Sequence, residues 1–207
     1  IVIASGKTMT IDSSFIGPVN ISGAASSGSL IVNPDTTVDL SNVTFGTNVS
    51  ITANIESGDT ITLGSTGSVK VNVLDSSGFT VSGLDSNDSV AISVDDLLSA
   101  DATGSASGVA ALASVSASSA FDGKIFVGSD FNDKAAVVSA FDSFNDGSQS
   151  VGAIKTLLVD SDSGQVWYVS NSTPADGVTD AEVQLIGVLA PAAGGTLTAA
   201  NITVDHS

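Results

Sequence analysis

The sequence predicts a mainly β protein, with a repetitive β domain over residues 1–95 and a smaller α/β unit over 122–207. Three observations predict this organisation. Short β-branched segments separated by Gly, Ser, Asn and Asp fill the first half, Ile or Val recurs there at intervals of ten, and a helical stretch with a hairpin signal follows. Residues 96–121, which are rich in Ala, Ser and Gly, are expected to be a linker.

The first half carries the strand signals and the period. Its clearest segments are 30–32, 49–51, 60–63, 69–73 and 90–92, and the residues at positions 1, 11, 21, 31, 51, 61, 71 and 81 are all Ile or Val. A fixed period is typical of stacked coils with an aliphatic ladder inside, and two strands with two turns make a coil of about 20 residues. A β-solenoid is therefore expected. The alternative is a β-sandwich or jelly roll, whose strands also recur every 8–12 residues.

The second half predicts one helix packed on a sheet that contains a hairpin. A strand at 125–127 is followed by a helix over roughly 131–144, with Ser129 or Asp130 as its cap. Segments 154–159 and 166–169 flank a tight turn and predict the hairpin, and strands are expected at 183–189 and 202–204. Most aromatic residues fall in this half and are expected in its core: Phe121, Phe126, Phe131, Phe141, Phe144, Trp167 and Tyr168.

The charge balance excludes several classes of partner. The chain has 22 acidic residues, 5 basic ones and a net charge of −17, and its basic residues are all Lys. Nucleic acids are bound through Lys and Arg, so they are not expected as partners. No apolar run is long enough to insert into a membrane.

The residue types that most enzymes need are scarce. The single histidine, His206, lies next to the C-terminal residue, and Cys is absent. A Ser-His-Asp triad or a zinc site is therefore not expected, and the chain carries no phosphate-binding loop motif. Paired Asp residues could serve a polysaccharide-active solenoid enzyme, which is the weakest of the alternatives.

Clusters of Asp and Asn are candidate calcium sites, because Ca²⁺ takes six to eight oxygen ligands. The same residue types are also common in turns and caps, which is the alternative explanation for each cluster. The candidate ligands are Asp160 and Asp162; Asp142, Asn145 and Asp146; Asp130, Asn132 and Asp133; Asp176, Asp180 and Glu182; and Asp85, Asn87 and Asp88.

Three C-terminal segments resemble a family of secreted proteins. Segments 157–168 (LLVDSDSGQVWY), 182–189 (EVQLIGVL) and 197–204 (LTAANITV) resemble the C-terminal region of large RTX-type bacterial surface proteins. The first half is similar in texture to S-layer and adhesin repeats. The resemblance implies export, calcium-rich surroundings and a surface or matrix role. The Gly-rich nonapeptide that defines RTX calcium sites is absent, so those sites are not carried over.

Together these observations predict a non-enzymatic structural protein, secreted to a bacterial cell surface, that assembles with copies of itself. Calcium would bridge its carboxylates. The apolar N-terminal strand residues Ile1, Val2, Ile3, Met9 and Ile11 could be donated to the sheet of the next copy in a head-to-tail fibre. The alternative for this segment is pairing within its own domain. The alternative function is a monomeric, calcium-dependent adhesin module that binds surface glycans.

Overall fold

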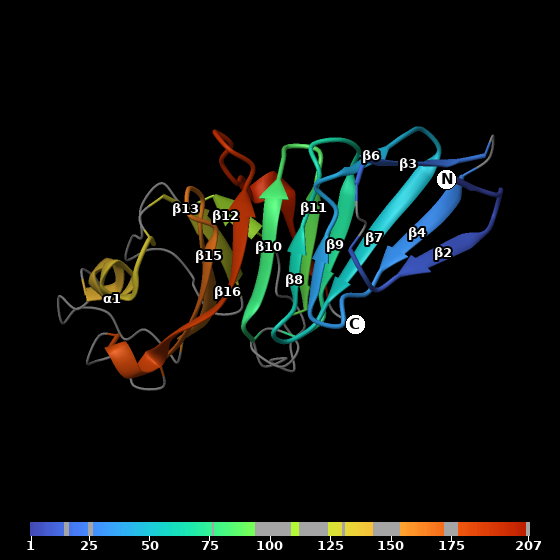
Figure 1. Ribbon diagram of the computed structural model, residues 1–207. Helices are drawn as coiled ribbons and strands as arrows, with labels where there is room; N and C mark the ends of the chain where they lie inside the picture. Colours follow the sequence, from blue (N-terminus) through green and yellow to red (C-terminus); the bar gives the residue numbers. More distant parts are fainter. Residues whose placement is uncertain are drawn as a thin grey trace.

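The computed structural model describes residues 1–14, 17–24, 27–75, 77–93, 109–111, 124–129, 131–142, 154–171 and 178–205. A β-solenoid of about four turns occupies residues 2–92, and a mixed sheet with one short helix follows it. The N-terminus lies at one end of the elongated molecule and helix α1 (Lys134–Asp142) lies at the other (Figure 1).

Three sheets organise the described strands. A three-stranded sheet has the order β1 (Val2–Ile3), β3 (Val19–Gly23), β6 (Val43–Phe45). A six-stranded sheet runs β17 (Ile202–Asp205), β11 (Ser89–Ser93), β9 (Val69–Val73), β7 (Val49–Ile55), β4 (Gly28–Val32), β2 (Thr8–Ile11). An eight-stranded sheet runs β12 (Val109–Ala111), β13 (Lys124–Gly128), β14 (Ile154–Asp160), β15 (Gln165–Asn171), β16 (Val183–Pro191), β10 (Phe79–Leu84), β8 (Thr60–Thr62), β5 (Thr37–Asp39).

The register confirms the predicted coil. Ile11 pairs with Val32, Val32 with Ala53, Ala53 with Val71 and Val71 with Val90, so one coil takes about 20 residues. All strand pairs among β1–β11 are parallel, so the sandwich alternative is wrong. The coils through β3–β5 and β6–β8 hold three strands each, one more than expected.

Alternation along each strand fills the inside of the coils. In β7, Ile51, Ala53 and Ile55 are buried, whereas Ser50 is exposed and Thr52 and Asn54 are only partly buried. Because successive side chains of a strand point to opposite faces, the aliphatic residues of neighbouring coils stack inside while hydroxyl and amide groups line the outside. Six of the eight periodic Ile and Val residues are buried in the solenoid core, whereas Ile1 is exposed and Ile31 is only partly buried.

The C-terminal unit follows the predicted order. β14 and β15 form the antiparallel hairpin, and α1 is shorter than the predicted 131–144. Its core holds Phe126, Phe131, Phe141 and Trp167, as expected, and the Trp167 indole N–H donates to the Phe131 carbonyl at 2.7 Å. Tyr168 is partly buried against the larger core cluster instead, which extends from the solenoid into the C-terminal unit, and Phe121 and Phe144 lie outside the described residues. In the segment expected to be a linker, β12 pairs with β13.

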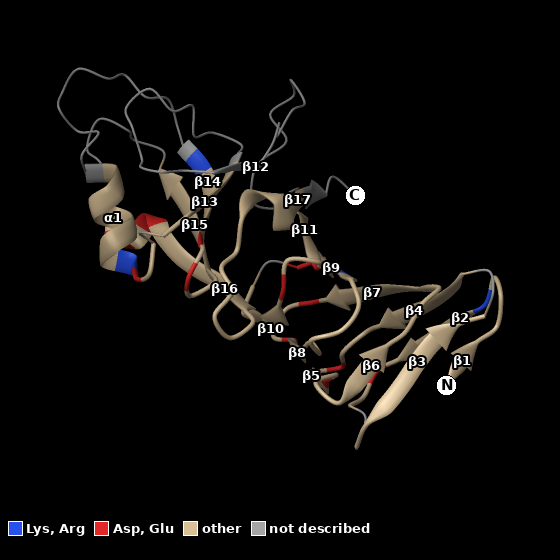
Figure 2. Ribbon diagram, turned by 90° about the horizontal axis from the view of Figure 1, so that it is seen from above, with Lys and Arg blue, Asp and Glu red and all other residues tan. Residues whose placement is uncertain are grey.

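The last two strands return to the solenoid. β16 pairs with β10 and β17 pairs with β11, both in parallel, so the sheets of the solenoid continue into the C-terminal unit. Strand β12, from the segment expected to be a linker, contacts β17 and the short helix η3 (Ala199–Asn201) near this end of the six-stranded sheet (Figure 2). The opposite end of that sheet is β2, where the described chain adds no further strand.

Candidate functional site

The N-terminal end of the solenoid presents two edge strands. β1 pairs only with β3 and β2 pairs only with β4 among the described strands. The side chains of Ile3 and Ile11 are buried in the core, and Met9 packs against it. In contrast, Ile1 is 55% exposed and Val2 is 69% exposed. This end therefore combines a closed core with uncovered backbone and apolar side chains.

The hydrogen bonds show which backbone groups face outward. The carbonyls of Lys7 and Ile11 accept the N–H groups of Ser29 and Asn33 on the β4 side, both at 2.9 Å. Because hydrogen-bonding direction alternates along a strand, the backbone N–H and C=O groups of Thr8 and Thr10 point away from β4. They form a row of donors and acceptors at the open edge.

This edge lacks the features that usually keep a strand edge unpaired. β2 has the sequence TMTI and β1 has VI, with no charge and no proline inside either strand. The eight-stranded sheet ends differently at β5, where the Ser14 hydroxyl accepts the N–H of Asp39 at 2.7 Å. Hydrogen bonds from the Ser41 side chain and backbone lower the pKa of Asp39, so β5 keeps a negative charge. In contrast to β5, the edge strands β1 and β2 carry no charged side chain within the strand.

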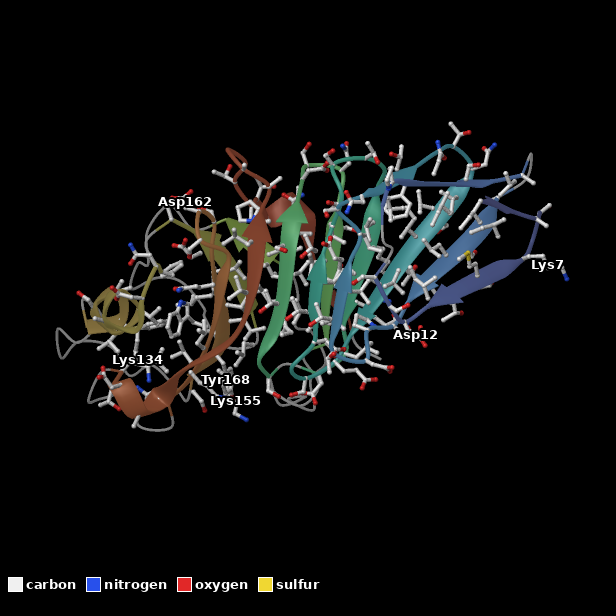
Figure 3. The ribbon with its side chains drawn as sticks, in the orientation of Figure 1. Lys7, Asp12, Lys134, Lys155, Asp162 and Tyr168 are labelled. Carbon is white, nitrogen blue, oxygen red and sulfur yellow. The ribbon has the colours of Figure 1, made fainter. Side chains whose placement is uncertain are left out.

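Two opposite charges flank β2. Lys7 precedes the strand and Asp12 follows it, and both side chains are exposed. Figure 3 shows them at the two ends of β2, pointing away from the body of the molecule. Five residue steps of extended chain separate them by about 16 Å, so they cannot form an ion pair with each other.

The predicted strand residues Ile1, Val2, Ile3, Met9 and Ile11 thus meet at this end, within their own sheets. The N-terminal ammonium donates to the Asn20 carbonyl at 2.6 Å, and Val2 pairs with Ser22. Donation of this segment to another copy would require it to leave β3 and β4. Pairing along the open edge requires no such change.

Asp160, the first calcium candidate, is fully buried and serves the backbone. Its carboxylate accepts the N–H groups of Phe131 at 3.0 Å, Asp162 at 3.2 Å and Ser163 at 2.7 Å, and the Ser163 hydroxyl at 2.8 Å. These bonds hold the turn between β14 and β15 against the segment that leads into α1. Asp162 is exposed at the tip of the same turn.

Other candidate carboxylates also occupy caps and turns. Asp133 accepts the N–H of Ala136 at 2.7 Å near the start of α1. Glu182 accepts both the N–H and the hydroxyl of Thr179 at 2.8 Å, and Asp180 is exposed. In the described ranges, no three His, Asp or Glu side chains come close enough to hold a metal ion. Asn132 is exposed, and the other candidates, Asp130, Asn145, Asp146, Asp176 and the Asp142 side chain, lie outside the described residues.

Two buried carboxylates close turns of the solenoid. Asp59 accepts the N–H of Glu56 at 2.9 Å, and Asp88 accepts those of Asp85 at 3.0 Å and Val69 at 2.9 Å. Desolvation raises the pKa of Asp88 and outweighs the lowering by these two hydrogen bonds. Asp88 is among the calcium ligands predicted from the sequence, whereas Asp59 is not. In both turns, 56–59 and 85–88, the accepting Asp is the fourth residue, and its carboxylate binds the N–H of the first residue. This spacing is the sequence pattern that the two turns share.

A shallow groove of about 320 Å³ lies where the chain leaves the six-stranded sheet. Asp35 and Glu56 line it, and so do Asn33 and Asn54, whose side-chain amides are hydrogen bonded to each other at 2.9 Å. Pro34 and Leu74 supply its apolar part. The groove is polar and open to solvent. No Lys is among the described residues that line it.

The comparisons with known proteins add no family. No family model, no curated protein and no solved structure matches this chain. Among the described helices, none has the length and hydropathy of a segment that crosses a bilayer.

Proposed function

We propose that this protein is a secreted, non-enzymatic structural protein that assembles with copies of itself at a bacterial cell surface. It would be a subunit of an S-layer, an extracellular filament or a matrix. The observation that supports this proposal is the uncharged edge of β1 and β2, because open strand edges pair with further strands when nothing protects them. Export rests on the resemblance of segments 157–168, 182–189 and 197–204 to RTX-type surface proteins.

The net charge sets the conditions for assembly. A net charge of −17 on each copy makes close approach unfavourable, because the five Lys residues balance only part of the charge of the 22 acidic residues. Salt screens this repulsion over a Debye length of about 8 Å, and divalent cations act more strongly by bridging carboxylates. Calcium would therefore act between copies, by bridging exposed carboxylates such as those of Asp12, Asp35 and Asp75.

Electron microscopy and analytical ultracentrifugation test the proposal. The purified protein is compared in low-salt buffer with EDTA, with millimolar CaCl₂, and with NaCl at matched ionic strength. We expect larger assemblies with calcium than with NaCl, and their loss when EDTA is added. A protein that stays monomeric at every concentration and in every buffer contradicts self-assembly.

The groove supports a second candidate, a monomeric adhesin module that binds glycans. Amide and carboxylate groups, here Asn33, Asn54, Asp35 and Glu56, are suited to hydrogen bonding with sugar hydroxyls. Binding to a glycan array by the monomer, lost in Glu56→Ala but kept in the exposed Asp75→Ala control, would favour this function. Assemblies without glycan affinity would favour the first.

A further inference from the structure

We infer that residues 183–205 form a fifth coil of the solenoid, and that residues 94–182 are a unit inserted into the turn before this coil. The inserted unit contains β12, β13, β14, β15 and α1. The inference places the last coil of the solenoid inside the segment 122–207, which the sequence assigns to a separate unit. It implies that the inserted unit can open while the five coils stay folded.

The pairing of β16 and β17 repeats the pairing of the earlier coils. β10 lies in parallel between β8 and β16, so that Thr80 is opposite Thr60 on one side and Val188 on the other. β11 lies in parallel between β9 and β17, with Val90 opposite Ile202. β16 and β17 therefore extend each of the two large sheets by one strand, as one further coil would do.

The turn before β17 has the same chemistry as the turn before β11. The side chain of Asp88 accepts the N–H of Asp85 at 3.0 Å, and that of Asn201 accepts the N–H of Thr198 at 3.1 Å. In both turns the accepting residue is the fourth, and a strand begins at the next residue. The turns also touch, because the side-chain amide of Asn201 donates to the Asp88 carbonyl at 3.1 Å. Turn 198–201 thus stacks on turn 85–88 as turns of successive coils do.

The buried side chains of β16 and β17 belong to the solenoid core. Ile186 is 1% exposed, Leu189 0% and Ile202 2%. They share one hydrophobic cluster with Val81 and Ile92 of the preceding coil. This segment therefore continues the aliphatic interior of the solenoid as well as its sheets.

The inserted unit has a second hydrophobic cluster, which is rich in aromatic side chains. Its members from β13, α1, β15 and the segment before α1 include Phe126, Phe131, Val137, Phe141 and Trp167. The unit also contacts the solenoid, because β15 pairs with β16, and Leu157 and Val166 join the larger cluster. A cluster of its own allows such a unit to open without unfolding the coils beside it.

The insertion lies at a connection that is short in the other coils. Residues 56–59 connect β7 to β8, and residues 74–78 connect β9 to β10. Residues 94–182 make the equivalent connection from β11 to β16. All three lead from the six-stranded sheet to the eight-stranded sheet. Turns of a repeat protein tolerate insertions, because the strands on both sides keep their partners.

Hydrogen exchange of the intact chain tests the inference. Exchange is measured by mass spectrometry of peptides, at denaturant concentrations below the unfolding transition, and shows which strands open together. We expect peptides 186–191 and 202–205 to exchange together with peptide 79–93 from β10 and β11. Peptides from 124–129, 131–142 and 154–171 are expected to form a separate group that exchanges at lower denaturant concentration.

Two matched variants assign the strands to their units. Val81 in β10 and Val137 in α1 are both 0% exposed, the first in the solenoid core and the second in the aromatic cluster. Val81→Ala is expected to accelerate exchange about ten-fold or more in 79–93 and in 202–205, through loss of core packing. Val137→Ala is expected to accelerate exchange in 131–142 and 154–171, and to change that of 202–205 by less than about two-fold.

The response of peptide 202–205 decides the outcome. If it follows Val137→Ala instead of Val81→Ala, β17 belongs with the hairpin and helix, and the inference is overturned. If all peptides respond equally to both variants, the chain is one cooperative unit, which also overturns it. The natural chain in denaturant gives the same grouping without any substitution, so the test does not depend on either variant folding. Neither result bears on self-assembly.

Discussion

The carboxylate of Asp160 accepts the backbone N–H of Phe131 at 3.0 Å, across 29 residues of sequence. This bond ties the β14–β15 turn to the segment that precedes α1, and the Trp167 indole N–H donates to the carbonyl of the same Phe131. The acidic turn that the sequence analysis considered as a calcium site is thus a fixed junction between the hairpin and the helix.

We predict that Asp160→Ala destabilises the protein by about 3 kcal/mol, because it leaves the buried N–H of Phe131 and the partly buried N–H groups of Asp162 and Ser163 without an acceptor. Chemical denaturation in EDTA measures the change. Asp162→Ala is the matched control at an exposed position of the same turn, and its effect should stay within about 0.5 kcal/mol. If the turn held a structural calcium ion, both variants would lose a calcium-dependent rise in stability, contrary to this prediction.

The return of β16 to the solenoid depends on a small residue. A Cβ atom added at Gly187 would lie 2.4 Å from the ring of Phe79, which is completely buried in β10. We therefore predict that Gly187→Ala destabilises the fold by about 2 kcal/mol through overpacking. Thermal or urea unfolding measures this.

A double-mutant cycle provides the control for this contact. Phe79→Leu shortens the side chain and makes room for the new methyl group, so Gly187→Ala should cost about 1 kcal/mol less in that background. Strictly additive effects would show that β16 does not pack on Phe79. Such a result would contradict the long-range pairing of β10 with β16, in which Phe79 lies opposite Gly187.

The sequence predicts the solenoid well because its signal is local and repeated. Ile51, Ala53 and Ile55 alternate with polar residues on one strand, and a coil of about 20 residues brings the same pattern back beside it. The return of β16 to β10 has no such signal. Its register depends on contacts such as that of Gly187 with Phe79, between residues more than 100 positions apart.

The sequence likewise predicts only part of each candidate site. The apolar segment that includes Val2 and Met9 is visible in the sequence as strand-forming, but only the pairing with β3 and β4 shows which of its sides is open. Asp160 is visible as a turn residue, yet its acceptor role depends on the distant N–H of Phe131. Composition identifies polar residues in turns, and it cannot distinguish a ligand from a backbone acceptor.

The carboxyl group of Asp88 makes stability depend on pH. Burial raises its pKa above the ordinary value of 3.8, despite hydrogen bonds from Asp85 and Val69, and the neighbouring Asp85 carboxylate adds to the increase. Because the folded state holds the proton more tightly than the unfolded state, this group contributes more stability as the pH falls. Its contribution is complete below 3.8 and is lost as the pH rises through the raised pKa of the folded state.

We predict that Asp88→Asn removes this proton-linked gain and also loses one of the two oxygen acceptors that Asp88 offers to Val69 and Asp85. The melting temperatures of the natural chain and the variant, measured from pH 3 to pH 7, give the comparison. The advantage of the natural chain should widen as the pH falls, against the usual trend for carboxylates stabilised by ion pairs. Asp75→Asn, at an exposed position on another turn, is the matched control. If the difference in melting temperature between the natural chain and Asp88→Asn narrows as the pH falls, the folded state favours the charged carboxylate. That result would be opposite to the effect expected from burial.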